Sequence, residues 1–227
     1  MKNYAKKFSE YCETNFELEA AETLIAYKSL SVCILDCIYS LRTKYYSVTV
    51  PLVERYASLY MDGNRFNSGD TVGLLLKHIE DQGGPKKFAE NVLKNHQKLG
   101  GKADIAKEDV CYQLAHFLKL LNVDTIDDFQ HFESQELLEV VIRSVKGMGD
   151  AGTNYLFMLA GDPNRCKPDV HIHRCVRNVC GIDLSNEECQ DLFSETVELL
   201  NIKYPQLTAR RLDSIIWEHY QNHLNKY

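Results

Sequence analysis

The chain has 227 residues, 44% of them hydrophobic, and a formal net charge of −6 at pH 7. This length and apolar content suffice for one compact domain or two small lobes and argue against a disordered chain. The acidic balance argues against binding nucleic acid with the whole surface, because such proteins neutralise phosphates with lysine and arginine. With no long apolar run and no secretory leader, we expect an intracellular protein without a membrane partner.

Helical periodicity dominates almost every segment, with apolar residues recurring every three or four positions. In chain order, we expect apolar helical faces on Leu18, Ala21, Leu24 and Ile25 and on 32–41, then helices over 51–60, 71–79, 85–100, 110–121, 134–145 and 151–160, one after Asp169, one behind the Ser185 and Glu188 capping box, and one after Pro205. The helix that starts at Pro85 should end at Gly100-Gly101. The sequence therefore predicts an all-α fold.

The cysteines are the next feature to interpret. Eight cysteines could form disulfides, but a chain of this size needs none for stability. Cys33 and Cys37 lie one helical turn apart in an apolar segment. We therefore expect reduced, buried thiols.

A glycine-rich turn, Gly147-Met148-Gly149, joins the predicted helices within 134–160. Glycines allow backbone conformations that other residues avoid, and they let a phosphodiester approach the amides at the start of the next helix. Basic residues outnumber acidic ones over 143–177, so this stretch is locally positive. A plain helix-helix turn would also favour glycine, so the turn by itself fits either role.

Residues 147–152 also match the G-x-G-x-x-G fingerprint of dinucleotide-binding folds, and Asp169 follows near the distance expected of the ribose-binding acid. That fingerprint needs a strand on each side. The stretch before Asp169 contains Pro163 and Pro168 and cannot be a buried parallel strand. The pattern therefore disfavours a nucleotide-binding oxidoreductase.

Asp169 follows Lys167-Pro168, which holds the backbone extended, and it stands where a helix should begin. Such an aspartate can be a simple N-cap. Next to a loop that grips phosphate, it is also placed to face the sugar of a captured nucleotide. Both interpretations stay open on the residues alone.

The pattern from Gly147-x-Gly149 through Asp169-x-His171-Ile172-x-Arg174 resembles the helix-hairpin-helix DNA glycosylases of the endonuclease III superfamily, whose signature ends in a catalytic aspartate. Residues 40–48 are similar to the helix-loop segment in which those enzymes insert a polar side chain into the duplex, with Arg42 at that wedge position. Residues 212–218 are similar to the last helix of family members.

The resemblance implies two helical lobes with an active-site cleft between them. The inner lobe would span 35–162 and contain the helix-hairpin-helix at 134–160, and residues 1–34 and 163–227 would form the second lobe. The protein would be a monomeric, monofunctional DNA glycosylase of base excision repair. Its partner would be double-stranded DNA with a damaged or mispaired base. Asp169 would be the catalytic carboxylate that acts on the glycosidic bond.

The remaining site residues are contacts to DNA. The candidates are Arg42, Lys146, Gly147, Gly149, Ala151, Gly152, His171 and Arg174. Each charged candidate has a plainer interpretation: Arg42 as a surface arginine at a helix end, His171 as a buried structural histidine, and Lys146 and Arg174 as solvated surface charge. The aromatic residues Tyr45, Tyr46 and Trp217 could stack on a flipped base, although aromatic residues of helical proteins are more often core.

Several residues depart from the family pattern. Ala151 stands where bifunctional members carry a lysine nucleophile, so we expect no strand cleavage by a Schiff base. Asp150 would weaken DNA binding unless it caps the following helix. Cys166, Cys175, Cys180 and Cys189 are too widely spread for an iron-sulfur cluster. The set Cys166, His171, His173, Cys175 and Cys180 lacks zinc spacing, so we expect no cofactor and no metal. Asp150 and the acidic balance keep one alternative open, a catalytically silent helix-hairpin-helix DNA-binding protein.

Overall fold

The computed structural model describes residues 1–19, 26–100 and 104–224, with the backbone alone for 222–224. Within these ranges every regular element is a helix, which confirms the all-α class, and the only ladder contact there is an isolated bridge between Lys98 and Ala106. Ala21, Leu24 and Ile25, which the sequence placed on a helical face, lie outside the described residues.

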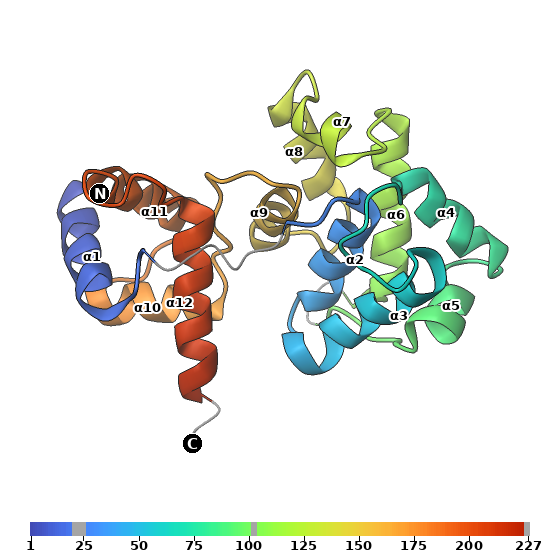
Figure 1. The fold of residues 1–227 in the computed structure, drawn as a ribbon, viewed down its shortest axis with the longest axis horizontal. Helices are drawn as coiled ribbons and strands as arrows, with labels where there is room; N and C mark the ends of the chain where they lie inside the picture. Colours follow the sequence, from blue (N-terminus) through green and yellow to red (C-terminus); the bar gives the residue numbers. More distant parts are fainter. Residues whose placement is uncertain (20–25, 101–103, 225–227) are drawn as a thin grey trace. The chain divides into compact units, whose positions relative to one another are not determined.

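The described helices follow one another along the chain (Figure 1). They are α1 (Lys2–Asn15), α2 (Leu30–Ser40), η1 (Tyr45–Thr49), α3 (Val50–Tyr60), α4 (Val72–Asp81), α5 (Pro85–Phe88), η2 (Ala89–Leu93), α6 (Lys107–Leu120), α7 (Ile126–Gln130), α8 (Gln135–Ser144), α9 (Asp150–Leu159), α10 (Val170–Cys180), α11 (Asn186–Leu200) and α12 (Ala209–Leu224). The segments η1 and η2 are π-helical.

The chain divides into two compact units. We call Ala26–Gly161 the central unit, and we call Met1–Ile25 together with Asp162–Tyr227 the terminal unit. A boundary at residue 35, as the sequence suggested, would cut through the middle of α2. The central unit begins before that helix instead, because α2 is fully buried within it.

Helix α2 is the core of the central unit. All of its residues are buried, and it packs against α3, α4, α6 and α9. A helix that is apolar on every side must be surrounded in this way. Cys33 and Cys37 lie on α2 as free, buried thiols. The other six cysteines, which lie elsewhere in the chain, are free and buried as well.

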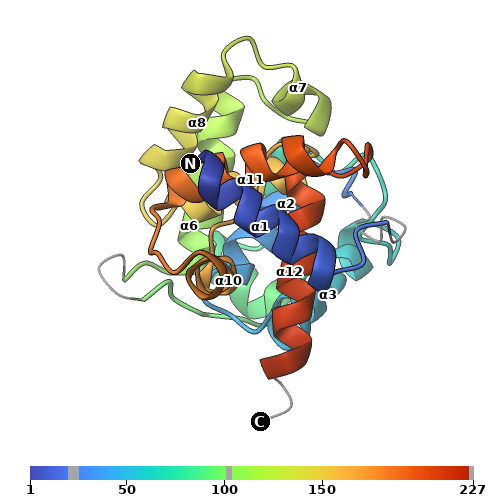
Figure 2. The same ribbon diagram turned by 90° about the vertical axis from the view of Figure 1, so that its left-hand side faces the viewer.

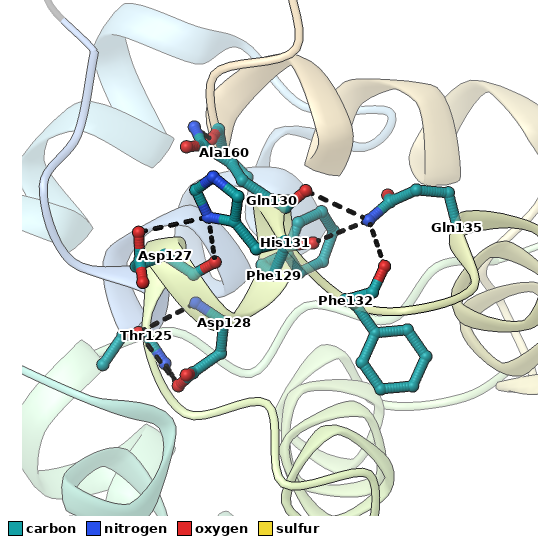
Figure 3. Close-up of polar contacts among 9 residues, drawn as sticks. All are labelled: Thr125, Asp127, Asp128, Phe129, Gln130, His131, Phe132, Gln135 and Ala160. Carbon is teal, nitrogen blue, oxygen red and sulfur yellow. Dashed lines mark hydrogen bonds and ion pairs between the residues drawn. The ribbon is translucent and has the colours of Figure 1, made fainter.

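The far end of α9 is held by the short helix α7 (Figure 3). A capping box between Thr125 and Asp128 starts α7. The side-chain nitrogen Nε2 of Gln130 donates to the carbonyl oxygen of Ala160 at 2.6 Å. Gly161 follows with a φ of 108°, and a Cβ at that position would overlap the Gln130 amide. The sequence did not predict α7, although its capping box was readable there.

The terminal unit is a small bundle whose own core includes Phe8 and Phe193, with ring centroids 5.7 Å apart. Helix α1 packs against α10 and α11, and α12 packs against the same two helices (Figures 1 and 2). The capping box of Ser185 and Glu188 opens α11, as the sequence predicted.

One predicted helix is shorter than expected. The helix that begins at Pro85 was predicted to reach Gly100-Gly101, but helical structure ends at Leu93 and Lys94 adopts a left-handed conformation with a φ of 52°. The guanidinium of Arg55 on α3 donates two hydrogen bonds to the carbonyl oxygen of Leu93, at 2.6 and 3.1 Å. The Arg55 side chain satisfies the carbonyl of Leu93 at the end of the helix, so the helix can end there without a glycine. Gly101 lies outside the described residues.

Candidate nucleic-acid interface and catalytic carboxylate

The two glycines of the hairpin between α8 and α9 serve different purposes. Gly147 has a φ of 103°, and a Cβ there would overlap the Cδ1 atom of Leu99. Gly149 has an ordinary φ of −98° and is exposed, and no atom lies within 4 Å of where its Cβ would stand. Gly147 is therefore required by the fold, whereas Gly149 leaves its backbone open to a ligand.

Gly149 is the N-cap residue of α9 and provides no side chain to accept from the first amides of that helix. Asp150 does not fill this role: its carboxylate lies 3.3 Å from Nε of Arg143, whose Nη2 is 2.6 Å from Glu139. Asp150 therefore does not cap the helix, because the arginine near the end of α8 binds it instead. Lys146 is exposed in the same turn.

Arg42 lies just after α2 and is exposed. Its φ of 55° places it in the left-handed region, where a residue other than glycine costs roughly 1 kcal/mol or more. Its Nη1 donates to the carbonyl oxygen of Leu99 at 3.4 Å. A strained backbone that displays a basic side chain is a pattern found at functional sites.

The loop that carries Arg42 is held from below by Lys107, whose side chain is almost fully buried. The Lys107 ammonium donates to the carbonyl oxygens of Leu41 at 2.8 Å and Tyr39 at 3.0 Å, and to the hydroxyl of Thr43 at 2.6 Å. Nothing in the sequence pattern of the DNA-binding candidates included this residue. A lysine in the first turn of a helix, where the macrodipole disfavours a cation, was the signal that could have revealed it.

Packing brings the loop after α2 and the hairpin together. The side chain of Leu99 contacts the backbone at Gly147, and its carbonyl oxygen accepts from Arg42. The Cδ1 atom of Leu41 lies within 3.5 Å of the Cβ position of Gly152. The structure therefore places the predicted wedge residue and the predicted phosphate-binding turn on neighbouring parts of the central unit.

A buried carboxylate ties the same elements together deeper in the core. Asp36 of α2 accepts hydrogen bonds from the hydroxyl groups of Tyr27 at 2.7 Å, Tyr45 at 2.8 Å and Tyr155 at 3.0 Å. Burial, followed by the Asp36 charge, raises the pKa of Tyr45 well above its usual range. Tyr45 is therefore a structural residue, and its neighbour Tyr46, with 63% of its surface exposed, is the better placed of the two to meet a ligand.

In the terminal unit, Asp169 is the N-cap of α10. Its Oδ1 atom accepts from the backbone N–H groups of His171 at 2.8 Å and Ile172 at 3.2 Å, and its side chain is partly exposed. Both bonds use one carboxylate oxygen, so they fix the orientation of the group.

The segment leading to Asp169 is attached to α11 and α12 by hydrogen bonds at successive positions. The amide of Arg210 donates to Pro163, and the amide of Cys166 donates to Gln190 at 2.9 Å. The amide of Lys167 donates to Asp213 at 2.9 Å. These contacts within the terminal unit hold the irregular backbone that leads to Asp169.

The other predicted residues of α10 have mixed surroundings. The ring Nε2 of His171 lies 3.2 Å from Nε2 of Gln221, and its Nδ1 is buried with no hydrogen-bond partner among the residues described. His173 contacts Asn186 at 2.8 Å and the Cys189 sulfur at 3.6 Å. Arg174 is half-buried on the same helix.

Two further observations concern ligands and membranes. Over the described ranges, no three histidine, cysteine, aspartate or glutamate side chains gather closely enough to hold a metal ion. In the same part of the chain, none of the helices combines the length and the apolar character needed to cross a bilayer.

Comparison with known proteins adds a family without an assigned activity. A family model described as "Domain of unknown function (DUF8548)" matches residues 6–221. No curated protein matches the chain.

Proposed function

The chain belongs to the DUF8548 family, and we propose that it is a monofunctional DNA glycosylase of base excision repair. In this proposal the protein acts inside the cell, as a monomer, on double-stranded DNA with a damaged or mispaired base. It hydrolyses the N-glycosidic bond of a nucleotide that has been rotated out of the duplex. The proposal rests on the resemblance of residues 147–174 to helix-hairpin-helix glycosylases and on the geometry of the central unit.

The observation that carries the proposal is the shared contact of Gly147 and Arg42 with Leu99. The resemblance assigns these two residues to separate tasks on the same DNA, and they stand 105 positions apart in the sequence. A protein that binds the DNA backbone and fills the gap left by a flipped nucleotide needs these two residues close together, and both contact the same leucine. A plain helix-helix turn does not demand that neighbour.

The hairpin supplies the grip. Backbone amides at the exposed start of α9, together with Lys146, would bind a phosphate next to the flipped nucleotide without reading its sequence. The negative charge of Asp150 would otherwise repel that phosphate. Its ion pair with Arg143 offsets much of this repulsion.

Arg42 supplies the wedge. A base inside a duplex cannot reach a catalytic group, so its nucleotide must leave the stack while a side chain occupies the gap. Arg42 is exposed at the end of a fully buried helix. Lys107 donates to the carbonyl oxygen of Leu41 before it and to the hydroxyl of Thr43 after it. A rigid base under a long polar side chain suits this task.

Asp169 supplies the negative charge. Cleavage of the glycosidic bond builds positive charge on the deoxyribose, and a fixed carboxylate stabilises that transition state. The two N-cap bonds hold the Asp169 carboxylate in one orientation, and the same group can orient the attacking water. Ala151 offers no amine, so the enzyme would leave an abasic site without cutting the strand.

The test is a panel of duplexes with alkylated, oxidised, deaminated and mismatched bases, incubated with the protein and then treated with alkali to cut abasic sites. We expect product from at least one lesion and a loss of about 10²-fold or more with Asp169→Asn, which retains the N-cap. The matched control is Asp183→Asn, an exposed aspartate of the same unit paired with Arg177, which removes the same charge and should keep full activity.

A second candidate function is a catalytically silent helix-hairpin-helix DNA-binding protein. The net charge of −6 and the aspartate at the start of α9 favour it. Binding of duplexes without product from any lesion, with equal behaviour of Asp169→Asn and the unmodified protein, would select this candidate.

A further inference from the structure

Asp213 on α12 is a buried carboxyl group next to the segment that carries Asp169. Only 5% of its surface is exposed. Its Oδ1 atom accepts a hydrogen bond from the backbone amide of Lys167 at 2.9 Å, and the carbonyl oxygen of that same lysine accepts from the amide of Asp169 at 2.6 Å. Asp213 therefore holds the residue whose backbone shapes the turn into Asp169.

We propose that Asp213 is a positioning residue for Asp169: through the amide of Lys167, α12 sets the turn that carries the Asp169 carboxylate. The catalytic meaning of this role rests on the proposed function above. The anchoring itself does not, because it concerns only hydrogen bonds within the terminal unit.

The surroundings of Asp213 favour its protonated form. Burial raises its pKa well above the usual range, and the nearby Asp169 carboxylate raises it further, whereas the Lys167 amide and the Lys167 charge act in the opposite direction. The thiol of Cys166 is a third titratable neighbour, and its own pKa is raised by burial and then by Asp213. A protonated Asp213 still offers an acceptor oxygen to the Lys167 amide.

This protonation has a consequence for stability. An aspartate in the unfolded chain loses its proton near pH 3.9. Above that pH the folded protein retains a proton at Asp213 that the unfolded chain has released, so the folded state loses stability as the pH rises. The loss continues until the pH passes the raised folded pKa. The effect is limited to about tenfold in the unfolding constant per pH unit, the value for one proton.

The test compares the unmodified protein with Asp213→Asn, which keeps an acceptor oxygen but cannot titrate, and with Asp213→Ala, which has no acceptor. Urea unfolding from pH 4.5 to pH 8 should show the unmodified protein losing stability relative to Asp213→Asn as the pH rises. Hydrogen exchange at the Lys167 amide should be about tenfold or more faster in Asp213→Ala and nearly unchanged in Asp213→Asn. A Lys167 amide equally protected in the Ala variant would overturn the proposal, and parallel pH profiles of the unmodified protein and the Asn variant would contradict the protonated form of Asp213. If the Ala variant does not fold, the amide exchange of the Asn variant decides: a Lys167 amide that loses protection although the acceptor oxygen is kept would overturn the proposal.

Measurements of base removal distinguish the failure of the glycosylase proposal from the failure of the positioning role of Asp213. On a lesion that the protein processes, Asp213→Ala should lower kcat about tenfold or more with little change in KM, and Asp213→Asn should restore most of that loss. An equal kcat in the Ala variant would contradict the positioning role. If no lesion is processed by the unmodified protein, the glycosylase proposal fails, while amide exchange still confirms or refutes the anchoring by Asp213.

Discussion

The ammonium group of Lys107 lies 2.8 Å from the carbonyl oxygen of Leu41, at the end of a helix to which Lys107 does not belong. Residues at the C-terminus of a helix leave carbonyl groups unsatisfied and form the negative end of its dipole. The buried Lys107 ammonium also donates to the carbonyl oxygen of Tyr39 and so satisfies a second carbonyl there. The loop with Arg42 is thus supported by α6 as well as by α2.

We expect Lys107→Met to lower the free energy of unfolding by about 3 kcal/mol or more. The substitution keeps a long apolar stem but leaves the carbonyl oxygens of Tyr39 and Leu41 buried without their donor, at roughly 1–3 kcal/mol each. Urea unfolding measures the loss. Lys119→Met is the control, because that lysine is substantially exposed and its ion pair with Asp124 should contribute less than about 1 kcal/mol. An equal loss of unfolding free energy in the two variants would show that the buried ammonium of Lys107 stabilises the protein no more than an exposed one does.

Arg42→Gly should weaken base flipping without lowering the stability of the protein. Glycine accepts the φ of 55° without strain, so the variant should be as stable as the unmodified protein or more stable by up to about 1 kcal/mol. Base flipping should nevertheless weaken, measured by the fluorescence of 2-aminopurine opposite or beside the lesion, and the rate of base removal should fall about tenfold or more.

Lys94→Gly is the matched control for this experiment. Lys94 is also an exposed basic residue with a left-handed backbone, at a φ of 52°. Its replacement should relieve similar strain and leave flipping and base removal as they are. If Arg42→Gly behaves in the same way as Lys94→Gly, Arg42 is a surface arginine at a helix end and not a wedge.

Features that depend on residues close together in the sequence could be predicted. The start of α10 at Asp169 and the capping box at Ser185 depend on residues within one turn of each other, and both were predicted. The same holds for the hairpin glycines, whose neighbours along the chain are helices of ordinary periodicity.

The missed features depend on residues distant in sequence. The end of helical structure at Leu93 is set by Arg55, and the surroundings of Arg42 are set by Lys107. In the sequence, Asp213 is one polar position of a predicted helix. Its contact with Lys167 exists only in the folded chain. Polar groups of this kind acquire their role only when folding brings a second element to them, so periodicity cannot identify them.

The hairpin glycines should respond differently to alanine. In Gly147→Ala, both the positive φ and the overlap with Leu99 oppose the new Cβ, so we expect a loss of about 2–4 kcal/mol in stability. In Gly149→Ala the φ is ordinary and the space around it is empty, so the protein should fold with a loss below about 1 kcal/mol. DNA binding by Gly149→Ala, measured by fluorescence anisotropy, should still weaken severalfold because the Cβ occupies the approach to the α9 amides. Unchanged DNA binding in this variant would show that the backbone at Gly149 does not meet phosphate.

The buried thiols of the terminal unit should resist alkylation in the folded protein. Burial raises the pKa of Cys175 to about 12, and burial followed by the Glu188 charge raises that of Cys189 to about 12 as well. Because the thiolate is the reactive form, both residues should react with iodoacetamide at pH 8 at least about 10³-fold more slowly than a free cysteine. Unfolding in guanidinium should expose them, and mass spectrometry of the digested protein measures each site. The same shifts mean that the folded state loses stability above pH 8.5, where the unfolded chain ionises these thiols and the folded protein does not. Rapid labelling of either cysteine without denaturant would contradict the buried environment described for the terminal unit.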